Sequence, residues 1–249
     1  MTGAAPLYVY GVVGGDQPLP AAAGIDEQPV RLLSEDGVGA IVSDVQQPSP
    51  ALGRGALTAH GRVLEMLIAS RTVLPMRFGV VMEGAEAVRE GLLRPHRDAL
   101  LAQLERLDGR VELTLRATYE EAPLLREILA EEPQIRAMQA AAKRAGGGAY
   151  MDRIRLGELI AAAVDARRRR DAEQIMARLT PLAEDFQVSE PRHERMALSA
   201  SFLVARDGIA EFDAAVEDVG QQQHVRMRLR YTGPLPPHSF VTLEQQGAG

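Results

Sequence analysis

A strict alternation of apolar and polar residues runs from position 111 to position 118, and it limits the possible folds more than any other stretch of the chain. Its apolar members are Val111, Leu113, Leu115 and Ala117, and each is followed by a polar residue. Successive side chains of a strand point to opposite faces, so this pattern predicts a β-strand with one buried face and one solvated face. The rest of the chain must therefore supply partner strands and helices that cover the buried face.

The residues before this strand predict a first domain of mixed helices and strands. Residues 7–13 (LYVYGVV) read as a strand, and two short apolar runs around an Asp-Gly turn, 30–33 and 38–45, read as an antiparallel hairpin. Apolar residues at helical spacing follow from Leu57 to Ile68, then a short strand at 80–82 and helices over 85–93 and 96–107. We predict an α+β domain over residues 1–119, a ferredoxin-like variant with an antiparallel-rich sheet and helices on one face.

The second half predicts another α+β domain, over residues 120–232. Helical patterns cover 121–144, with a break at Pro133, and 150–179, with a glycine hinge at 146–148 between them. Strands at 186–188 and 196–205, a helix from Ile209 to a C-terminal glycine at Gly220, and a final strand at 224–231 complete it. We expect helices with a small antiparallel sheet, followed by a C-terminal tail at 233–249.

Composition excludes several classes of function. The chain of 249 residues contains no cysteine, so it has no disulfide, thiolate nucleophile or zinc-thiolate site. A net charge of -6 and an aromatic content of 4% predict that the chain binds neither nucleic acid nor an anionic membrane. The N-terminal sequence MTGAAPLYVYGVV lacks the features of a signal peptide, and no segment has the length and apolarity of a membrane span. We expect a cytoplasmic protein.

Sequence motifs give no support for catalysis, a metal site or a cofactor. The histidines never occur as HxH, HxxH or HExxH, and GxGxxG, GxxxxGK[ST] and GxSxG are absent. His60 lies on the apolar face of its predicted helix, where a lone histidine is more often a hydrogen-bonded core residue than a catalytic one. The Arg167–Arg170 run points in four directions around a helix and is interpreted as a solvated, self-paired segment.

Two groups of residues remain as possible interaction sites. In the final strand, Arg226, Arg228 and Arg230 alternate and would share one face, where they pair with neighbouring carboxylates or with a partner protein. In the segment TVLPMRFGVVMEG, the unusual residues are Pro75, Arg77, Phe78 and Gly79. They predict either a bulged strand start with a buried structural arginine or a surface contact, because an arginine cannot be buried without a partner.

These segments resemble the gas vesicle protein F/L (GvpF/GvpL) family, in which a VLPxRFG segment lies between two helices. Further similar segments occur in the family's order: LYVYGVV, GVGAIVSDV, LTAHGRVLEML, LDGRVELTLRA, GGGAYM and YTGPLPPHSFV. In the last, Gly233, Pro234, Pro236 and Pro237 match the family's GPWPPYSF motif, whereas Leu235 and His238 stand at its tryptophan and tyrosine. This departure puts in doubt any role of those aromatic residues.

The resemblance implies a non-enzymatic minor component of gas vesicles that is needed for their formation. Such a protein would bind the small hydrophobic shell protein and other gas vesicle accessory proteins during nucleation, through a sheet edge or a helix groove. A different class of function stays open on the residues alone: a small-molecule-binding regulatory or enzymatic protein that uses Arg77, His60 and the glycine turn at Gly14 and Gly15.

Overall fold

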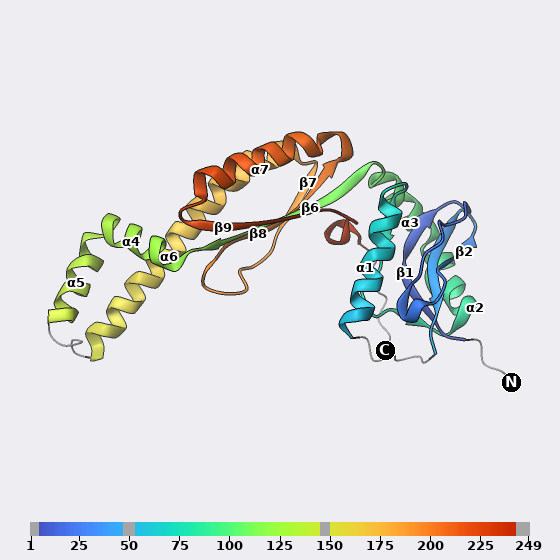
Figure 1. Cartoon of the computed structure of the whole chain (residues 1–249), viewed down its shortest axis with the longest axis horizontal. Helices are drawn as coiled ribbons and strands as arrows, with labels where there is room; N and C mark the ends of the chain where they lie inside the picture. The colour runs from blue at the N-terminus through green and yellow to red at the C-terminus, as the bar shows by residue number, and fades with distance from the viewer. Residues whose placement is uncertain (1–4, 47–52, 145–149, 243–249) are drawn as a thin grey trace. The chain divides into compact units, whose positions relative to one another are not determined.

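The structure is a computed structural model, and it describes residues 5–46, 53–144 and 150–242. The chain forms two compact units, Met1–Glu112 with Gly233–Gly249, and Leu113–Thr232. Both combine helices with an antiparallel sheet, which confirms the predicted α+β class (Figure 1). The division between the units falls inside β6 (Arg110–Tyr119), whereas the sequence placed it after residue 119, and the predicted tail joins the first unit.

The sheet of the first unit is built around β1 (Leu7–Gly14). The strand order is β2-β3-β1-β4, with β2 at Arg31–Glu35, β3 at Val38–Asp44 and β4 at Val73–Pro75. A fifth strand, β5 (Val81–Met82), pairs with β1 as well, and all of these pairings are antiparallel. The β2–β3 hairpin that the Asp-Gly turn predicts is therefore confirmed.

Strands β4 and β5 share one edge of β1 and leave a gap between them. β4 pairs with Gly11 to Val13, β5 pairs with Leu7 and Tyr8, and the register of β1 against β3 shifts between Val9 and Gly11. A Cβ on Gly11 would lie 2.7 Å from the carbonyl oxygen of Leu74, so only glycine permits this approach of the two backbones. Residues 76–80 cross the gap, which makes the motif segment a bulged edge.

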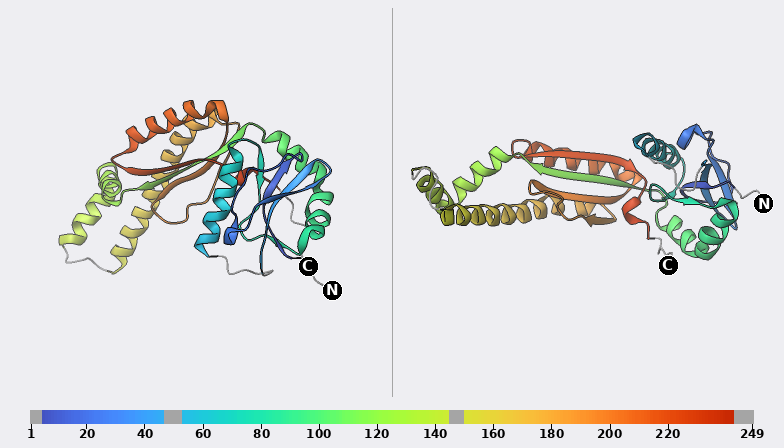
Figure 2. Two further views of the ribbon diagram at one scale, coloured as in Figure 1. Left: turned by 45° about the vertical axis from the view of Figure 1, so that its right-hand side comes forward. Right: turned by 90° about the horizontal axis from the view of Figure 1, so that it is seen from below.

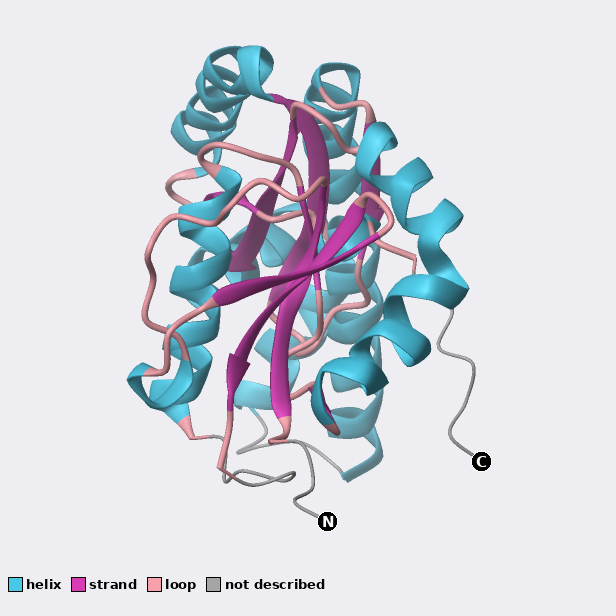
Figure 3. Ribbon diagram, turned by 90° about the vertical axis from the view of Figure 1, so that its right-hand side faces the viewer, coloured by secondary structure: helices cyan, strands magenta, loops and turns pink. Residues whose placement is uncertain are grey.

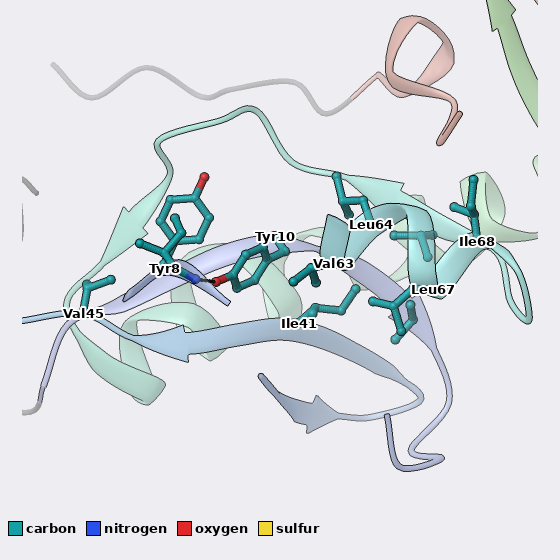
Figure 4. Close-up of a cluster of buried hydrophobic side chains, with 11 residues drawn as sticks. Tyr8, Tyr10, Ile41, Val45, Val63, Leu64, Leu67 and Ile68 are labelled. Atoms are coloured by element: carbon teal, nitrogen blue, oxygen red, sulfur yellow. Dashed lines mark hydrogen bonds between the residues drawn. The ribbon is translucent and has the colours of Figure 1, made fainter. Parts of the chain in front are cut away.

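Helices cover both faces of this sheet, and our expectation that they cover one face was wrong. α1 (Arg54–Ile68) packs over a cluster that includes Tyr8, Tyr10 and Ile41 (Figure 4). The helix formed by α2 (Gly84–Val88), a π-helical turn (Arg89–Leu93) and α3 (Arg94–Arg106) lies on the other side (Figure 2). Figure 3 shows helices to both sides of the strands.

The sequence of β1 indicates that helices cover both faces of this sheet. Every residue of β1 from Leu7 to Val13 is buried, so neither face of that strand meets solvent. A continuous apolar run of this kind is typical of strands that are covered on both sides, whereas alternation is typical of strands with one solvated face. The π-helical turn spans Arg89–Leu93, α3 spans Arg94–Arg106, and a short 3-10 helix, η1, spans Ile25–Glu27.

The sheet of the second unit has the strand order β7-β8-β6-β9. β7 spans Asp185–Val188, β8 spans Met196–Ala205 and β9 spans Met227–Leu235. α6 (Tyr150–Leu179) and α7 (Ile209–Gln223) cover one face, where the rings of Phe202 and Phe212 lie 5.1 Å apart (Figure 1). The remaining helices of this unit are α4, Glu121–Glu131, α5, Pro133–Arg144, and the 3-10 turns η3, Thr180–Leu182, and η4, Arg206–Gly208. A further 3-10 turn, η5, His238–Phe240, belongs to the first unit.

Several boundaries in this unit follow the prediction and others do not. The break at Pro133 and the helix 150–179 are confirmed, while the glycine hinge at 146–148 lies outside the described residues. The predicted end of α7 at Gly220 was wrong, because the helix continues to Gln223 and β9 begins only at Met227. Val216 and Val219 are buried and hold the last turns of α7 in place, so tertiary packing overrides the glycine signal.

Two glycine substitutions test how closely the backbone of the first unit is packed. Gly11→Ala is expected to lower the free energy of unfolding by about 1 to 3 kcal/mol, because its Cβ would collide with the Leu74 carbonyl. Gly61→Ala, in the middle of α1 and with open space around it, is expected to raise it by roughly 0.5 to 1 kcal/mol. Urea unfolding of both variants measures the difference, and equal effects of the two would contradict this description of the β1–β4 contact.

Candidate functional site

The loop 76–80 between β4 and β5 is fixed by hydrogen bonds at both ends and in the middle. The Met76 N–H donates to the Tyr10 carbonyl at 2.9 Å, and the Val9 N–H donates to the Val80 carbonyl at 3.0 Å. The Gly79 N–H donates to the Tyr8 hydroxyl at 3.0 Å, with Gly79 at φ 96°, a conformation that favours glycine. The loop therefore has one defined backbone path, and Gly79 is required for it.

Aromatic rings from three elements pack together beneath this loop. The ring of His60, on α1, stacks on Tyr10 at 5.7 Å and meets Tyr8 and Phe78 edge-on at 5.7 and 5.8 Å. The His60 Nδ1 and the Tyr8 hydroxyl are hydrogen-bonded at 3.0 Å. His60 is 4% exposed, so the interpretation of His60 as a hydrogen-bonded core residue agrees with its place in the structure.

Burial sets the protonation of this cluster. Burial and, to a smaller extent, the nearby His238 lower the pKa of His60 to about 4, although the hydrogen bond with the Met76 backbone opposes both effects. Burial also raises the pKa of Tyr8 to about 12, although the hydrogen bond from Gly79 opposes the change. His60 and Tyr8 are therefore neutral at pH 7, and a histidine with so low a pKa is a weak general base at that pH.

The pKa of His60 predicts how the stability depends on pH. Because the folded pKa of about 4 lies below the ordinary 6.5, the unfolded chain binds more protons between these values, and stability falls as the pH is lowered through this window. The wild type is expected to lose about 3 kcal/mol more than His60→Gln between pH 7 and pH 4. Denaturant unfolding measures this, with His193→Gln at an exposed histidine as control. Parallel pH profiles of the wild type and His60→Gln would contradict the prediction.

Arg77 and Phe78 project from this fixed loop to the surface. Arg77 is exposed, and its guanidinium forms no hydrogen bond or ion pair with any residue in the described ranges. Phe78 stays 36% exposed although its ring edge contacts His60 and Tyr8. The alternative of a buried structural arginine is therefore contradicted by the exposure of Arg77. We call this exposed pair the Arg77–Phe78 surface; Pro75, before it, is buried in β4.

The C-terminal motif packs on the same unit. Gln103 exchanges two hydrogen bonds with the backbone of Thr242, at 2.9 and 2.8 Å, and the buried Glu112 carboxylate accepts two from Ser239. Pro236 and Pro237 are buried, whereas Gly233 and Pro234 are exposed. His238, in this motif, also contributes to the lowered pKa of His60.

The three arginines that were predicted to share one face of the final strand lie in different environments. β9 begins at Met227, so Arg226 precedes the strand, and its guanidinium pairs with Asp171 at 2.7 Å and with Glu127 at 3.3 Å. Arg228 pairs with Glu120 at 3.0 Å. Arg230 is exposed, and no hydrogen bond or ion pair joins it to another described residue. Pairing within the chain thus accounts for two of these three arginines, and only the third, Arg230, has a guanidinium without a partner among the described residues.

A buried polar network in the second unit was missed by the sequence analysis. The Tyr119 hydroxyl donates to Asp171 at 2.6 Å, and Asp171, 3% exposed, also lies 3.7 Å from Arg167. Arg167 pairs further with Glu127 and Glu131, so its interpretation as solvated was wrong. Burial and the bond to Asp171 raise the pKa of the Tyr119 hydroxyl. One signal was available: Asp171 falls on the apolar side of α6, four residues before the buried Ile175.

The residues proposed for small-molecule chemistry are not brought together. Gly14 and Gly15 lie at the far end of β1 from Tyr8, about 20 Å away at the rise of a strand. His60 is buried and neutral at pH 7, and Arg77 points to solvent. Among the residues that the structure describes, no group of three or more histidine, aspartate or glutamate side chains is placed to hold a metal ion. The described helices also include none that is long and apolar enough to cross a membrane.

Comparisons with known proteins point to one family. The family model "Gas vesicle synthesis protein GvpL/GvpF" matches residues 6–242. Gas vesicle protein F of Streptomyces sp. (strain CB03234) is 37% identical over 238 residues, covering 94% of this chain and 98% of the relative. The crystal structure of GvpF from Anabaena sp. PCC7120 superposes with a TM-score of 0.85 at 27% identity, covering 96% of this chain and 99% of that one. GvpF from Microcystis aeruginosa superposes with a TM-score of 0.80, also at 27% identity.

Proposed function

Because this chain belongs to the gas vesicle GvpL/GvpF family, we propose that it is a non-enzymatic assembly factor of gas vesicles. It binds the small hydrophobic shell protein and other accessory proteins of the vesicle in the cytoplasm during nucleation. The observation that carries this proposal is the Arg77–Phe78 surface, which exposes an unpaired guanidinium and an aromatic ring on a rigid loop.

The chemistry of this surface suits protein recognition better than catalysis. Arginine and aromatic side chains are enriched at the centres of protein interfaces, where a few such residues provide most of the binding energy. The hydrogen bonds of Met76, Gly79 and Val80 hold the loop in place before binding, so little conformational entropy is lost on association. Leu57 lies one turn before His60 on α1 and is 53% exposed. It adds apolar surface to the helix whose His60 contacts the Phe78 ring.

The remaining motif residues have different roles in this proposal. Arg230, Gly233 and Pro234 are exposed and are further candidates for contacts with accessory proteins. Arg226 and Arg228 have partners within the chain, and Pro236 and Pro237 are buried, so they support the fold. No nucleic acid, membrane or cofactor enters this function. Catalysis has little support, because the buried histidine of the site is held neutral at pH 7 and the exposed arginine has no nucleophile assigned to it.

Co-purification tests the proposed function. The affinity-tagged chain is expressed with the gas vesicle shell protein of the same organism, and the shell protein is expected in the eluate at well above the level of an untagged control. A co-expressed unrelated protein of similar size should not elute. Absence of the shell protein, both with the chain alone and with the accessory proteins added, would contradict the proposal.

A further inference from the structure

Two arginines lie on the face of the second sheet that is opposite α6 and α7. The Tyr119 hydroxyl bonds to α6, and the Tyr231 ring stacks on Phe212 of α7, so these tyrosines mark the covered face of β6 and β9. Side chains alternate between the two faces along a strand. Arg116 is three residues before Tyr119, and Arg230 is one residue before Tyr231. Both arginines therefore point away from the helices.

The pairing of the two strands brings these arginines side by side. β6 and β9 are neighbours in the sheet, and the Glu120 N–H donates to the Arg226 carbonyl at 2.8 Å. Because the end of β6 meets the start of β9 at this bond, the two strands run in opposite directions. Counted from the bond in steps of two along both strands, Arg116 stands opposite Arg230. The Cβ atoms of opposite residues are about 5 Å apart, and like charges in this position destabilise a sheet.

No carboxylate among the described residues neutralises this pair. Arg116 and Arg230 are exposed, and within the described ranges neither guanidinium forms a hydrogen bond or an ion pair. The carboxylate of Glu120, on the same face, pairs with Arg228 at 3.0 Å. The uncharged neighbours of the pair on β6 and β9 are Thr114, Thr118 and Thr232.

The other carboxylates of this face are distant or already hydrogen-bonded. Glu112 is about 13 Å from Arg116 at the rise of a strand, and its two oxygens accept hydrogen bonds from Ser239. Asp185 belongs to β7, two strands away from β6, and its carboxylate accepts the Phe186 N–H at 2.8 Å. The centre of the face therefore carries an excess of positive charge, although the net charge of the chain is -6.

A cross-strand arginine of the first unit shows how such a charge is neutralised within the chain. Arg31 on β2 pairs with Asp44 on β3 through two hydrogen bonds, at 2.9 and 3.0 Å. The opposed Arg116 and Arg230 have no such acceptor, so their repulsion lowers the stability of the fold. A local arrangement that costs stability without compensation in the chain is typical of a functional surface.

We infer that this face binds an acidic segment of a partner protein, whose carboxylates pair with Arg116 and Arg230. Guanidinium groups form bidentate hydrogen bonds with carboxylates, and the surrounding threonine hydroxyls supply neutral donors. Binding then adds ion pairs and also removes the repulsion between the two arginines. A small free anion is a poorer match, because small ligands are held in concave sites that bury most of their surface. The net charge of -6 disfavours nucleic acid.

The inference goes beyond the proposed function. Arg116 and Arg230 belong to the second unit, whereas the Arg77–Phe78 surface belongs to the first, and the partner of this face is identified by its charge alone. The two surfaces are therefore separable by mutation.

The repulsion predicts an unusual effect of substitution on stability. Arg116→Thr, which continues the threonines on either side, is expected to raise the melting temperature by about 1 to 3 °C at low salt. Added salt should reduce this gain, because it screens the two charges. Arg155→Ala, at an exposed arginine of α6, is the control and should change the melting temperature by less than about 1 °C. A lower melting temperature of Arg116→Thr would assign Arg116 a structural role and contradict the inference.

Binding is measured by fluorescence anisotropy with two fluorescein-labelled peptides and the full chain. One peptide alternates glutamate with serine, and the other has glutamine at each glutamate position. The glutamate peptide is expected to bind, and more weakly as the salt concentration rises. Arg116→Thr and Arg230→Thr should each weaken its binding at least about fivefold, and Arg155→Ala less than about twofold.

Several results would overturn the inference. Equal binding of the glutamate peptide by the wild type, Arg116→Thr and Arg230→Thr would do so, as would equal binding of the glutamine peptide. Displacement of the peptide by inorganic phosphate, but not by sodium chloride of the same ionic strength, would make the face a site for small anions. If the wild type self-associates in sedimentation velocity and Arg116→Thr does not, the face joins copies of this chain. Co-purification of the shell protein does not depend on any of these results, so the proposed function is tested separately.

Discussion

Asp171→Ala is expected to lower the free energy of unfolding by about 3 to 5 kcal/mol and the melting temperature by roughly 10 °C. Asp171 accepts the Tyr119 hydroxyl at 2.6 Å and pairs with Arg226 at 2.7 Å, and it is almost completely buried. Its removal leaves a buried hydroxyl without an acceptor and leaves two partly buried guanidinium groups to share Glu127. Removing one partner from such a buried network lowers the free energy of unfolding by more than the intact network contributes to it.

Asp165→Ala is the matched control for this prediction. Asp165 lies on the same helix and pairs with Arg168, but it is exposed, so its loss is expected to cost less than about 1 kcal/mol. Thermal and urea unfolding of the two variants compare them directly. Asp171→Asn, which keeps an acceptor for Tyr119 and removes the charge, should fall between them. Equal stabilities of Asp165→Ala and Asp171→Ala would show that the buried network is not a source of stability.

Arg77→Ala is expected to abolish or strongly reduce gas vesicle formation while changing the free energy of unfolding by less than about 0.5 kcal/mol. Arg77 is exposed and has no partner within the described residues, so the folded chain loses no interaction that the structure shows. An arginine at the centre of an interface is commonly worth about 2 kcal/mol or more, which is about a 30-fold change in affinity.

Arg62→Ala controls for the loss of a positive charge from the first unit. Arg62 is exposed on α1 and, within the described residues, forms no ion pair or hydrogen bond through its side chain. Cells that carry Arg62→Ala should form vesicles as the wild type does, as judged by light scattering that collapses under pressure. Normal vesicle formation by Arg77→Ala would remove Arg77 from the proposed surface, and a loss of stability in this variant would assign it a structural role.

The sequence predicted the elements of the fold well where one periodicity was sufficient. The alternation over 111–118, the Asp-Gly hairpin and the 150–179 helix all match strands and helices of the structure. The sequence-based prediction failed where contacts between residues far apart in the chain determine the structure. Helices on both faces of the first sheet follow from the burial of β1, and the extension of α7 beyond Gly220 follows from contacts of Val216 and Val219.

The candidate site was only partly predictable for a similar reason. The motif residues Arg77, Phe78 and Gly79 stood out in the sequence, but Tyr8, which fixes Gly79, is 71 residues away along the chain. The buried acceptor Asp171 carries no local signal beyond being a polar residue on an apolar face, and Glu112 lies on the face of its strand that the alternation predicts to be solvated. Whether an arginine is buried or exposed depends on where the chain places its partners, so Arg226 and Arg77 look alike in sequence and differ in the structure.

The affinity of the purified shell protein for the purified chain and for Arg77→Ala tests the central claim most directly. Biolayer interferometry with the chain immobilised measures both under the same conditions, with Arg62→Ala as the control. The proposed role of the Arg77–Phe78 surface predicts that Arg77→Ala binds at least about tenfold more weakly while Arg62→Ala binds as the wild type does. Equal affinities of the wild type and Arg77→Ala would contradict it.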